Sequence, residues 1–279
     1  MARIALITGT STGIGLSAAV HLAKAGFQVV ATMRNLTKSD PLQERARAEG
    51  VTLDLQRLDV ESDISVEDCV RQVIAHYGRI DLLVNNAGAG HLGSLEQVSL
   101  EELRKTMEVN FFGVWRMTQA VFPHMRKQGS GRILTVTSVG GLIGQPFNDA
   151  YCAAKFACEG FLESLAPVAK RLGIHLVAIE PGPVSTEFVS TVHARNTEGS
   201  AVLDAYRPMV DSYLNGTKEA FAKHAQTGDD VAKVMVEAAT AETPHFRYVT
   251  SELVRGLVSR KYTDPTGDSI VTLTGSRLP

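Results

Sequence analysis

Short apolar runs alternate with longer segments of helical periodicity along most of the chain. The runs lack the apolar–polar alternation of a half-exposed sheet, so each strand is expected to be covered on both faces. We expect strands at residues 4–8, 28–32, 52–58, 80–84, 132–137, 174–179 and 247–249. We expect helices at residues 14–25, 66–77, 100–125 and 151–172. This alternation predicts an α/β fold with a doubly wound parallel sheet and helices on both faces.

The domain organisation follows from the same pattern. No internal repeat, low-complexity tract or linker divides the sequence, so we expect residues 1–279 to form a single Rossmann-like domain. Residues 190–226 have few strand signals and follow the sixth expected strand, and ligands in such sheets bind beyond the carboxyl ends of the strands. We expect this segment to be a substrate lid with two short helices, and the residues from about 251 to be a C-terminal extension.

Composition and charge exclude several classes of protein. The net charge of −2 gives no electrostatic footprint for a nucleic-acid partner. No stretch approaches the roughly 18 apolar residues of an integral membrane segment. The three cysteines, Cys69, Cys152 and Cys158, lack the spacing of a disulfide framework or a zinc site. We therefore expect a cytoplasmic protein that acts on a small-molecule substrate and binds no metal.

A glycine-rich loop, Thr8 to Gly15, joins the first expected strand to the first helix. Gly9, Gly13 and Gly15 allow the chain to turn sharply and a phosphate to approach the backbone. The helix start adds N–H groups and the positive end of the helix dipole. The spacing departs from the G-x-G-x-x-G fingerprint, and an ordinary tight turn is the alternative. The position at the first strand–helix junction favours a dinucleotide site.

Tyr151 and Lys155 are four residues apart near the start of a helix, so they share one face. A free tyrosine has a pKa near about 10, and a nearby ammonium lowers it, as a general acid/base requires. Ser138 ends the fifth strand, where its hydroxyl can hold a substrate oxygen. Asn110 is a polar residue in an apolar run and is expected to distort its helix. Each residue alone is compatible with packing or capping; their co-occurrence favours a catalytic site.

Together these motifs resemble the short-chain dehydrogenase/reductase family over about residues 3 to 188. The glycine loop matches its T-G-x-x-x-G-x-G pattern, and Asn85-Asn86-Ala87-Gly88 matches its N-N-A-G pattern. The resemblance implies a catalytic tetrad of Asn110, Ser138, Tyr151 and Lys155. In that tetrad the tyrosine is the acid/base, the lysine holds the nicotinamide ribose and lowers the tyrosine pKa, the serine orients the carbonyl, and the asparagine supports a proton-relaying water.

The resemblance also implies the contacts to the cofactor. The segment after the sixth strand seats the nicotinamide amide, an acid after the third strand contacts adenine, and the N-N-A-G segment lines the adenosine half. The expected contacts are Gly9, Ser11, Thr12, Gly13, Ile14, Gly15, Arg34, Asp59, Val60, Asn86, Ala87, Gly88, Tyr151, Lys155, Pro181, Gly182, Val184 and Thr186.

The choice between cofactors is predicted from the end of the second strand. An NAD-preferring site commonly carries an acid there, which accepts bonds from the ribose 2′-hydroxyl. Here the strand ends Thr32-Met33-Arg34-Asn35, and no acid appears before Asp40. Arg34 offers a planar charged fork suited to a 2′-phosphate, and Ser11 can add a hydroxyl contact. The alternative is that Arg34 is a solvated loop residue without a ligand. We predict that NADP(H) is preferred and that NAD(H) is possible.

Within the family, the sequence resembles the steroid and retinol dehydrogenase branch. The matching segments are Val30 to Asn35, Asn148, Phe246 to Thr250 and Asp264 to Gly267. The lid histidine of the steroid enzyme has no counterpart near Tyr206 to Pro208. We expect interconversion of an alcohol with a ketone or aldehyde on a lipophilic substrate, such as a steroid, a retinoid or another hydrophobic carbonyl.

Two other functions and an oligomeric state are also considered. A 3-oxoacyl carrier-protein reductase has the same tetrad on a shorter chain. A non-catalytic, dinucleotide-binding redox sensor is disfavoured, because such proteins tend to lose the tyrosine or the lysine. Family members commonly pair their two long helices, here about 100–125 and 151–172, so a homodimer or homotetramer is expected.

Overall fold

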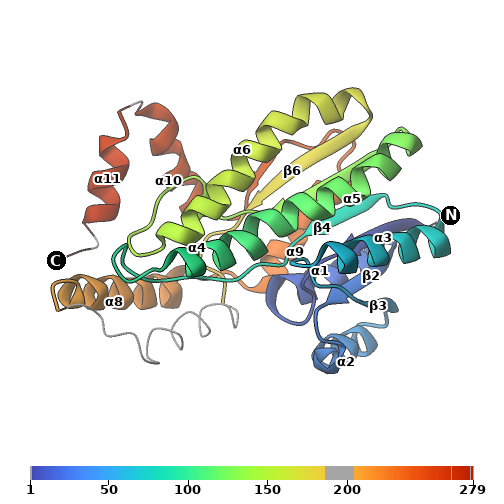
Figure 1. The fold of residues 1–279 in the computed structure, drawn as a ribbon, viewed down its shortest axis with the longest axis horizontal. Helices are drawn as coiled ribbons and strands as arrows, with labels where there is room; N and C mark the ends of the chain where they lie inside the picture. Colours follow the sequence, from blue (N-terminus) through green and yellow to red (C-terminus); the bar gives the residue numbers. More distant parts are fainter. Residues whose placement is uncertain (1, 186–203, 265, 277, 279) are drawn as a thin grey trace.

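The computed structural model describes residues 2–185, 204–264, 266–276 and 278. Their strands form one parallel sheet in the order β3-β2-β1-β4-β5-β6-β7 (Figure 1). The strands are β1 (Arg3–Ile7), β2 (Phe27–Met33), β3 (Leu53–Arg57), β4 (Leu82–Asn85), β5 (Gly131–Val136), β6 (Ile174–Glu180) and β7 (Arg247–Val249). Each expected strand is present, with ends displaced by at most two residues. The predicted fold class is confirmed.

Helices cover both faces of this sheet, which explains why the strand sequences are continuously apolar. The helices are α1 (Gly13–Lys24), α2 (Asp40–Ala48), α3 (Asp63–Tyr77), α4 (Leu100–Met107), α5 (Gly113–Gln128), α6 (Asp149–Arg171), α8 (Arg207–His224), α9 (Gly228–Thr240), α10 (Glu252–Thr263) and α11 (Asp268–Gly275). In β1, Ala5 and Ile7 belong to the core beneath α1 and α9. Ile4 and Leu6 belong to the opposite core, beneath α3, α5 and α6.

The long helix expected at residues 100–125 is interrupted. α4 ends at Met107, a π-helical turn spans Glu108–Phe112, and α5 begins at Gly113. Asn110 lies within the turn, and its Nδ2 donates to the carbonyl oxygen of Thr106 at 2.9 Å. The side chain thus supplies a donor to a backbone acceptor where the regular hydrogen-bond ladder is broken. The expectation of one continuous helix was wrong, whereas the expected distortion by Asn110 is observed.

The last third of the described chain is more helical than expected. α9 begins at a reciprocal capping box between Thr227 and Asp230 and packs against α1. α10 packs Val254 and Val258 against the loop that follows β5, so the C-terminal extension contributes to the core. No helix among the described residues is long and apolar enough to cross a bilayer.

Candidate active site

The predicted site residues gather at the carboxyl edge of the sheet. Because the strands are parallel, the segments that follow β1, β4, β5 and β6 all emerge at this edge. They are Thr8 to Gly15, Asn86 to Gly88, Ser138 with its flanking residues, and Pro181-Gly182. Chain order reverses between β1 and β4, which is the switch point where such sheets bind ligands.

The glycine loop forms a cradle that side chains would fill. A Cβ atom on Gly15 would lie 2.1 Å from the Gly9 carbonyl oxygen, and one on Gly9 would lie 2.8 Å from the Cα of Ala87. Gly9 and Gly13 have φ values of +70° and +59°, a region that favours glycine. The N-cap residue of α1, Thr12, makes no side-chain capping bond. The bare backbone and uncapped helix start therefore fit the pyrophosphate of a dinucleotide.

The segment after β4 braces this cradle. Asn86 donates from Nδ2 to the carbonyl oxygens of Thr8 and Gly9, at 3.0 and 2.9 Å. The backbone N–H groups of Asn86 and Ala87 both donate to Oγ1 of Thr8, at 3.0 Å each. Thr8 therefore joins the two segments, a role that sequence reasoning missed although the residue stands in the quoted motif.

Asn110, Gly88 and Lys155 come together at the centre of the site. Asn110 is fully buried, donates to the carbonyl oxygen of Ala89 at 2.8 Å and accepts from the Ala89 N–H at 3.2 Å. A Cβ atom on Gly88 would lie 2.8 Å from Asn110 Oδ1 and 3.7 Å from Lys155 Nζ. Residues from α6, from the π-helical turn and from the segment after β4 thus meet around one small space.

Ser138 and Tyr151 adjoin this group from the other side. Ser138 accepts a hydrogen bond from the N–H of Gly140 at 3.0 Å, which orients its hydroxyl. A Cβ atom on Gly140 would lie 3.3 Å from Tyr151 Cε1 and 3.4 Å from Ser138 Oγ. Lys155 Nζ lies 5.8 Å from the centre of the Tyr151 ring. The structure therefore brings all four members of the expected tetrad together.

The titration of Tyr151 depends mainly on burial. Burial raises the pKa of Tyr151 to about 12, although a hydrogen bond with Ser138 acts in the opposite direction. Burial also lowers the pKa of Lys155, whose Nζ donates to the Val136 carbonyl oxygen at 2.9 Å. Loss of solvation of the tyrosinate is the largest influence on this pKa, and the lowering expected from the neighbouring ammonium stays a prediction.

The segment after β6 lies beside the serine loop. The Pro181 carbonyl oxygen accepts from the N–H of Val139 at 2.9 Å, and a Cβ atom on Gly182 would lie 2.5 Å from Val254 of α10. Val184 pairs with Gln226 in an isolated bridge. Thr186, the last expected contact, lies outside the described residues.

These features agree with a comparison to known proteins. A model of short-chain dehydrogenases matches residues 3–197. This chain belongs to the short-chain dehydrogenase family. It is similar to 17-beta-hydroxysteroid dehydrogenase type 1 of Homo sapiens, with 42% identity over 280 residues that cover 98% of this chain and 85% of that protein. Retinol dehydrogenase 8 of Bos taurus is also 42% identical over 280 residues, covering 96% of this chain and 88% of that protein.

A solved structure of the same family shares the architecture. It is a variant of actinorhodin polyketide ketoreductase with NADPH, with a TM-score of 0.75, 28% identity, and coverage of 89% of this chain and 96% of that chain. The chain is therefore an oxidoreductase of the short-chain dehydrogenase family, and the glycine cradle described above fits the nicotinamide dinucleotides of that family.

Sequence reasoning missed Glu61, which lies near the expected adenosine end of the cradle. The exposed Arg34 lies next to Glu61, with 3.4 Å between Nη1 and Oε1. Glu61 in turn donates its N–H to Oδ1 of Asp59 at 3.1 Å, and Val60 between them is buried. Ser11 lies half-buried in the glycine loop. The predicted phosphate ligand therefore has an acidic neighbour, which no sequence motif marks.

The described part of the expected lid contains one long helix, α8. Residues 190–203 lie outside the described residues. Val210 and Tyr213 of α8 pack against Phe147, and the Tyr213 hydroxyl accepts from Nδ2 of Asn148 at 2.9 Å. Asn148 is the N-cap residue of α6 and precedes Tyr151 by three residues. Tyr213 thus links the lid to the catalytic helix, a contact between segments distant in sequence.

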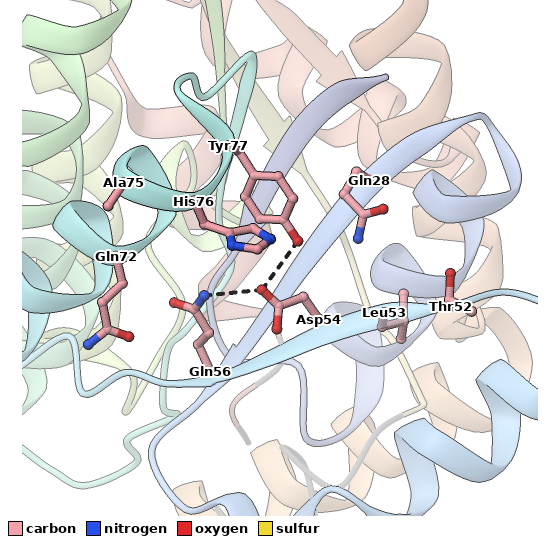
Figure 2. Close-up of a pocket in the computed structure, with 9 residues that line it drawn as sticks. All are labelled: Gln28, Thr52, Leu53, Asp54, Gln56, Gln72, Ala75, His76 and Tyr77. Atoms are coloured by element: carbon pink, nitrogen blue, oxygen red, sulfur yellow. Dashed lines mark hydrogen bonds between the residues drawn. The ribbon is translucent and has the colours of Figure 1, made fainter. Parts of the chain in front are cut away.

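An open depression of about 770 Å³ lies elsewhere, at the edge of the sheet near the starts of β2 and β3 (Figure 2). In it Asp54 accepts from Gln56 at 3.1 Å and from the Tyr77 hydroxyl at 3.4 Å. None of the predicted site residues lines this depression. It opens at the end of the strands opposite the tetrad, so it is separate from the candidate active site.

Proposed function

We propose that this dehydrogenase interconverts an alcohol and a ketone or aldehyde on a lipophilic substrate, with NADP(H) as the preferred cofactor. The observation that carries the proposal is the convergence of Asn110, Ser138, Tyr151 and Lys155 beside the glycine cradle. A nicotinamide dinucleotide held there supplies or accepts a hydride. The chain itself must then orient the substrate oxygen and move one proton.

Tyr151 is proposed as the group that exchanges the proton. In reduction its hydroxyl donates to the substrate oxygen, and its raised pKa keeps it protonated near neutral pH. Ser138, held by the N–H of Gly140, donates to the same oxygen as negative charge develops. Lys155 would hold the ribose hydroxyls, and Asn110 anchors the backbone around Ala89. In oxidation, the positive charges of Lys155 and of the oxidised cofactor favour the tyrosinate.

The surroundings of the tetrad support a lipophilic substrate. One apolar cluster joins Val139, Leu142 and Ile143, after Ser138, to Val254 and Val258 of α10. A second cluster surrounds the link between α8 and the catalytic helix. We propose that the segment 190–226 covers the substrate and excludes water during hydride transfer. The names of the two relatives reported above, a steroid and a retinol dehydrogenase, fit such a substrate.

A substrate panel tests this proposal. Steroid ketones, retinaldehyde, aliphatic ketones and an acetoacetyl thioester are supplied with NADPH, and the loss of NADPH absorbance is followed. Turnover of the first three classes supports the proposal. Preference for the thioester would favour a 3-oxoacyl carrier-protein reductase, and NADPH binding without turnover of any carbonyl would favour a redox sensor.

We further propose that the chain forms a homodimer or homotetramer through α5 and α6. Large apolar side chains are exposed there, among them Trp115 on α5, Phe112 just before it, and Phe156 and Val168 on α6. The Trp115 and Phe161 rings lie 4.6 Å apart, which joins the two helices into one aromatic surface. Burial against a second copy would remove this surface from water.

A further inference from the structure

A cluster of charged side chains lies buried behind the tetrad, between α6 and the end of the sheet. Arg247, the first residue of β7, places Nε 3.3 Å from Glu159 Oε2 and 3.1 Å from Glu180 Oε1. Its Nη2 lies 2.6 Å from Glu163 Oε2. Glu180 has no solvent exposure and Glu159 has 5%, whereas the Glu163 side chain is largely exposed. One guanidinium therefore lies within ion-pair distance of three carboxyl groups, two of which are buried.

Two further cations face the cluster, and each donates to a backbone carbonyl oxygen. Lys155 and Lys261 both face Glu159, but the first donates to the Val136 carbonyl oxygen and the second to that of Leu142. The remaining titratable or hydrogen-bonding neighbours are Cys158 of α6, Thr137 after β5 and Tyr262 of α10. Glu180 Oε2 has no hydrogen-bond partner among the described residues. A buried carboxylate oxygen without a donor is costly, which favours a proton on this pair.

The direction of titration agrees with this geometry. Burial, reinforced by the charge of Glu159, raises the pKa of Glu180 to about 8, although Arg247 acts in the opposite direction. Burial likewise raises the pKa of Glu159. The charge of Glu159 thus favours retention of a proton on Glu180, and Arg247 lies within ion-pair distance of both carboxyl groups.

The cluster contacts each of the segments that position the reacting groups. Glu180 directly precedes the Pro181-Gly182 turn, and Glu159 lies one helical turn after Lys155 on the same face of α6. A Cβ atom on Gly141, in the loop that follows Ser138, would lie 3.2 Å from Glu159 Cγ. The two carboxyl groups that meet at Arg247 therefore belong to the strand that leads into the turn and to the helix of Tyr151 and Lys155.

We propose that Glu159 and Glu180 share one proton and, clamped by Arg247, act as positioning residues that hold the Pro181-Gly182 turn against the helix of Tyr151 and Lys155. Loss of that proton to solvent at alkaline pH leaves two buried carboxylates that contact the same guanidinium, and their repulsion loosens the turn. The role of the turn in cofactor binding rests on the proposed function; the shared proton does not.

The first experiment measures thermal unfolding against pH for the full chain and for Glu180→Gln. Folded Glu180 keeps its proton to about pH 8, whereas an unfolded glutamate loses it near about pH 4.3. The folded state therefore binds more protons between these values, and stability falls as pH rises across them. The glutamine in the variant cannot ionise. The unfolding midpoint of the variant minus that of wild type should therefore grow by at least about 3 °C between pH 5.5 and pH 8.5.

Glu163→Gln is the matched control, because its carboxyl contacts the same arginine but is largely exposed. Its unfolding midpoint should follow the wild-type pH dependence. A constant offset between wild type and Glu180→Gln at every pH would overturn the shared proton. Should Glu180→Gln fail to fold, Glu159→Gln replaces it, because the remaining carboxyl then pairs with Arg247 alone; a wild-type pH dependence in that variant would equally overturn the proposal.

The second experiment measures the dissociation constant of NADPH by its fluorescence. Between pH 7 and 9, the NADPH affinity of wild type should fall by at least about fivefold more than that of Glu180→Gln. Only wild type gains a second buried carboxylate over this range. Equal pH dependence in the two proteins would overturn the positioning role. Failure of the proposed function is recognised separately, as an absence of NADPH binding in both proteins at pH 7.

Discussion

At the scale of single residues, Tyr151 combines a half-buried ring, a serine partner and a lysine 5.8 Å from the ring centre. Burial raises the pKa of Tyr151 to about 12, although the hydrogen bond with Ser138 acts in the opposite direction. A protonated hydroxyl at neutral pH suits the donation of a proton to a carbonyl oxygen. This state fits the proposed role of Tyr151 as the proton donor in reduction.

Removal of the Tyr151 hydroxyl isolates its chemical role. Tyr151→Phe should lower the rate of reduction by roughly 10²- to 10⁴-fold, because it removes the transferable proton. NADPH affinity should stay near that of wild type, since the ring remains. Tyr213→Phe is a control that loses a hydroxyl outside the tetrad. Near-native turnover of Tyr151→Phe on a verified substrate would contradict the mechanism.

Arg34 and its acidic neighbour give a second test at this scale. Arg34→Ala should weaken NADPH binding about ten- to a hundredfold with little change for NADH, because charge-assisted hydrogen bonds contribute roughly 1.5–3 kcal/mol. Glu61→Gln should act in the opposite direction, since Glu61 contacts the same guanidinium and repels a phosphate. Titration of each variant with both cofactors measures this. Equal or tighter binding of NADH by wild type would refute the predicted preference.

At the scale of elements, the π-helical turn at Glu108–Phe112 shows how a functional residue interrupts a helix. The turn places Asn110 so that its amide bonds both the helix before it and the segment after β4. α4 and α5 are therefore two helices separated by this turn and not one continuous helix. The irregular backbone and the buried amide support each other.

Asn110→Ala should destabilise the protein, because it leaves buried backbone groups without their partners. Each unsatisfied group costs about 1–3 kcal/mol, so the free energy of unfolding should fall by at least about 2 kcal/mol. Chemical denaturation followed by circular dichroism measures this change. Asn148→Ala, which removes an amide at the N-cap of α6, serves as a control for loss of an amide near the site. An unfolding curve unchanged from wild type would show that water replaces the amide without cost.

At the scale of the whole molecule, the parallel sheet places the carboxyl ends of four strands beside one another and so assembles the site. The same architecture leaves the aromatic surface of α5 and α6 on the outside. Figure 1 shows these two helices along one side of the molecule, with α10 and α11 near the start of α6. The site and the proposed subunit contact thus share a single helix.

A charge on this surface should separate the subunits. Trp115→Glu places a carboxylate in the aromatic group of Phe111, Trp115 and Phe161, where pairing with a second copy would bury it. Light scattering after size-exclusion chromatography should then show a smaller species than wild type. Glu101→Gln, an exposed change on α4, is the control. A monomeric wild-type protein would rule out the proposed contact.

The sequence by itself determined the fold class and the members of the tetrad. Continuous apolar strands, glycine turns and the fixed spacing of Tyr151 and Lys155 are local signals that the chain carries irrespective of its partners. The approach of Ser138 to that pair also followed, because Ser138 comes after β5 and parallel strands end at one edge, whereas the place of Asn110 was implied only by the family resemblance.

Only the tertiary structure decided the features that depend on distant neighbours. The raised pKa of Tyr151 results from burial by several segments, and the partners of Arg247 come from α6 and β6. Glu61 beside Arg34 and Tyr213 beside Asn148 likewise join residues 27 and 65 positions apart. Charge balance and solvation depend on which side chains surround a group in space, and sequence spacing does not determine that.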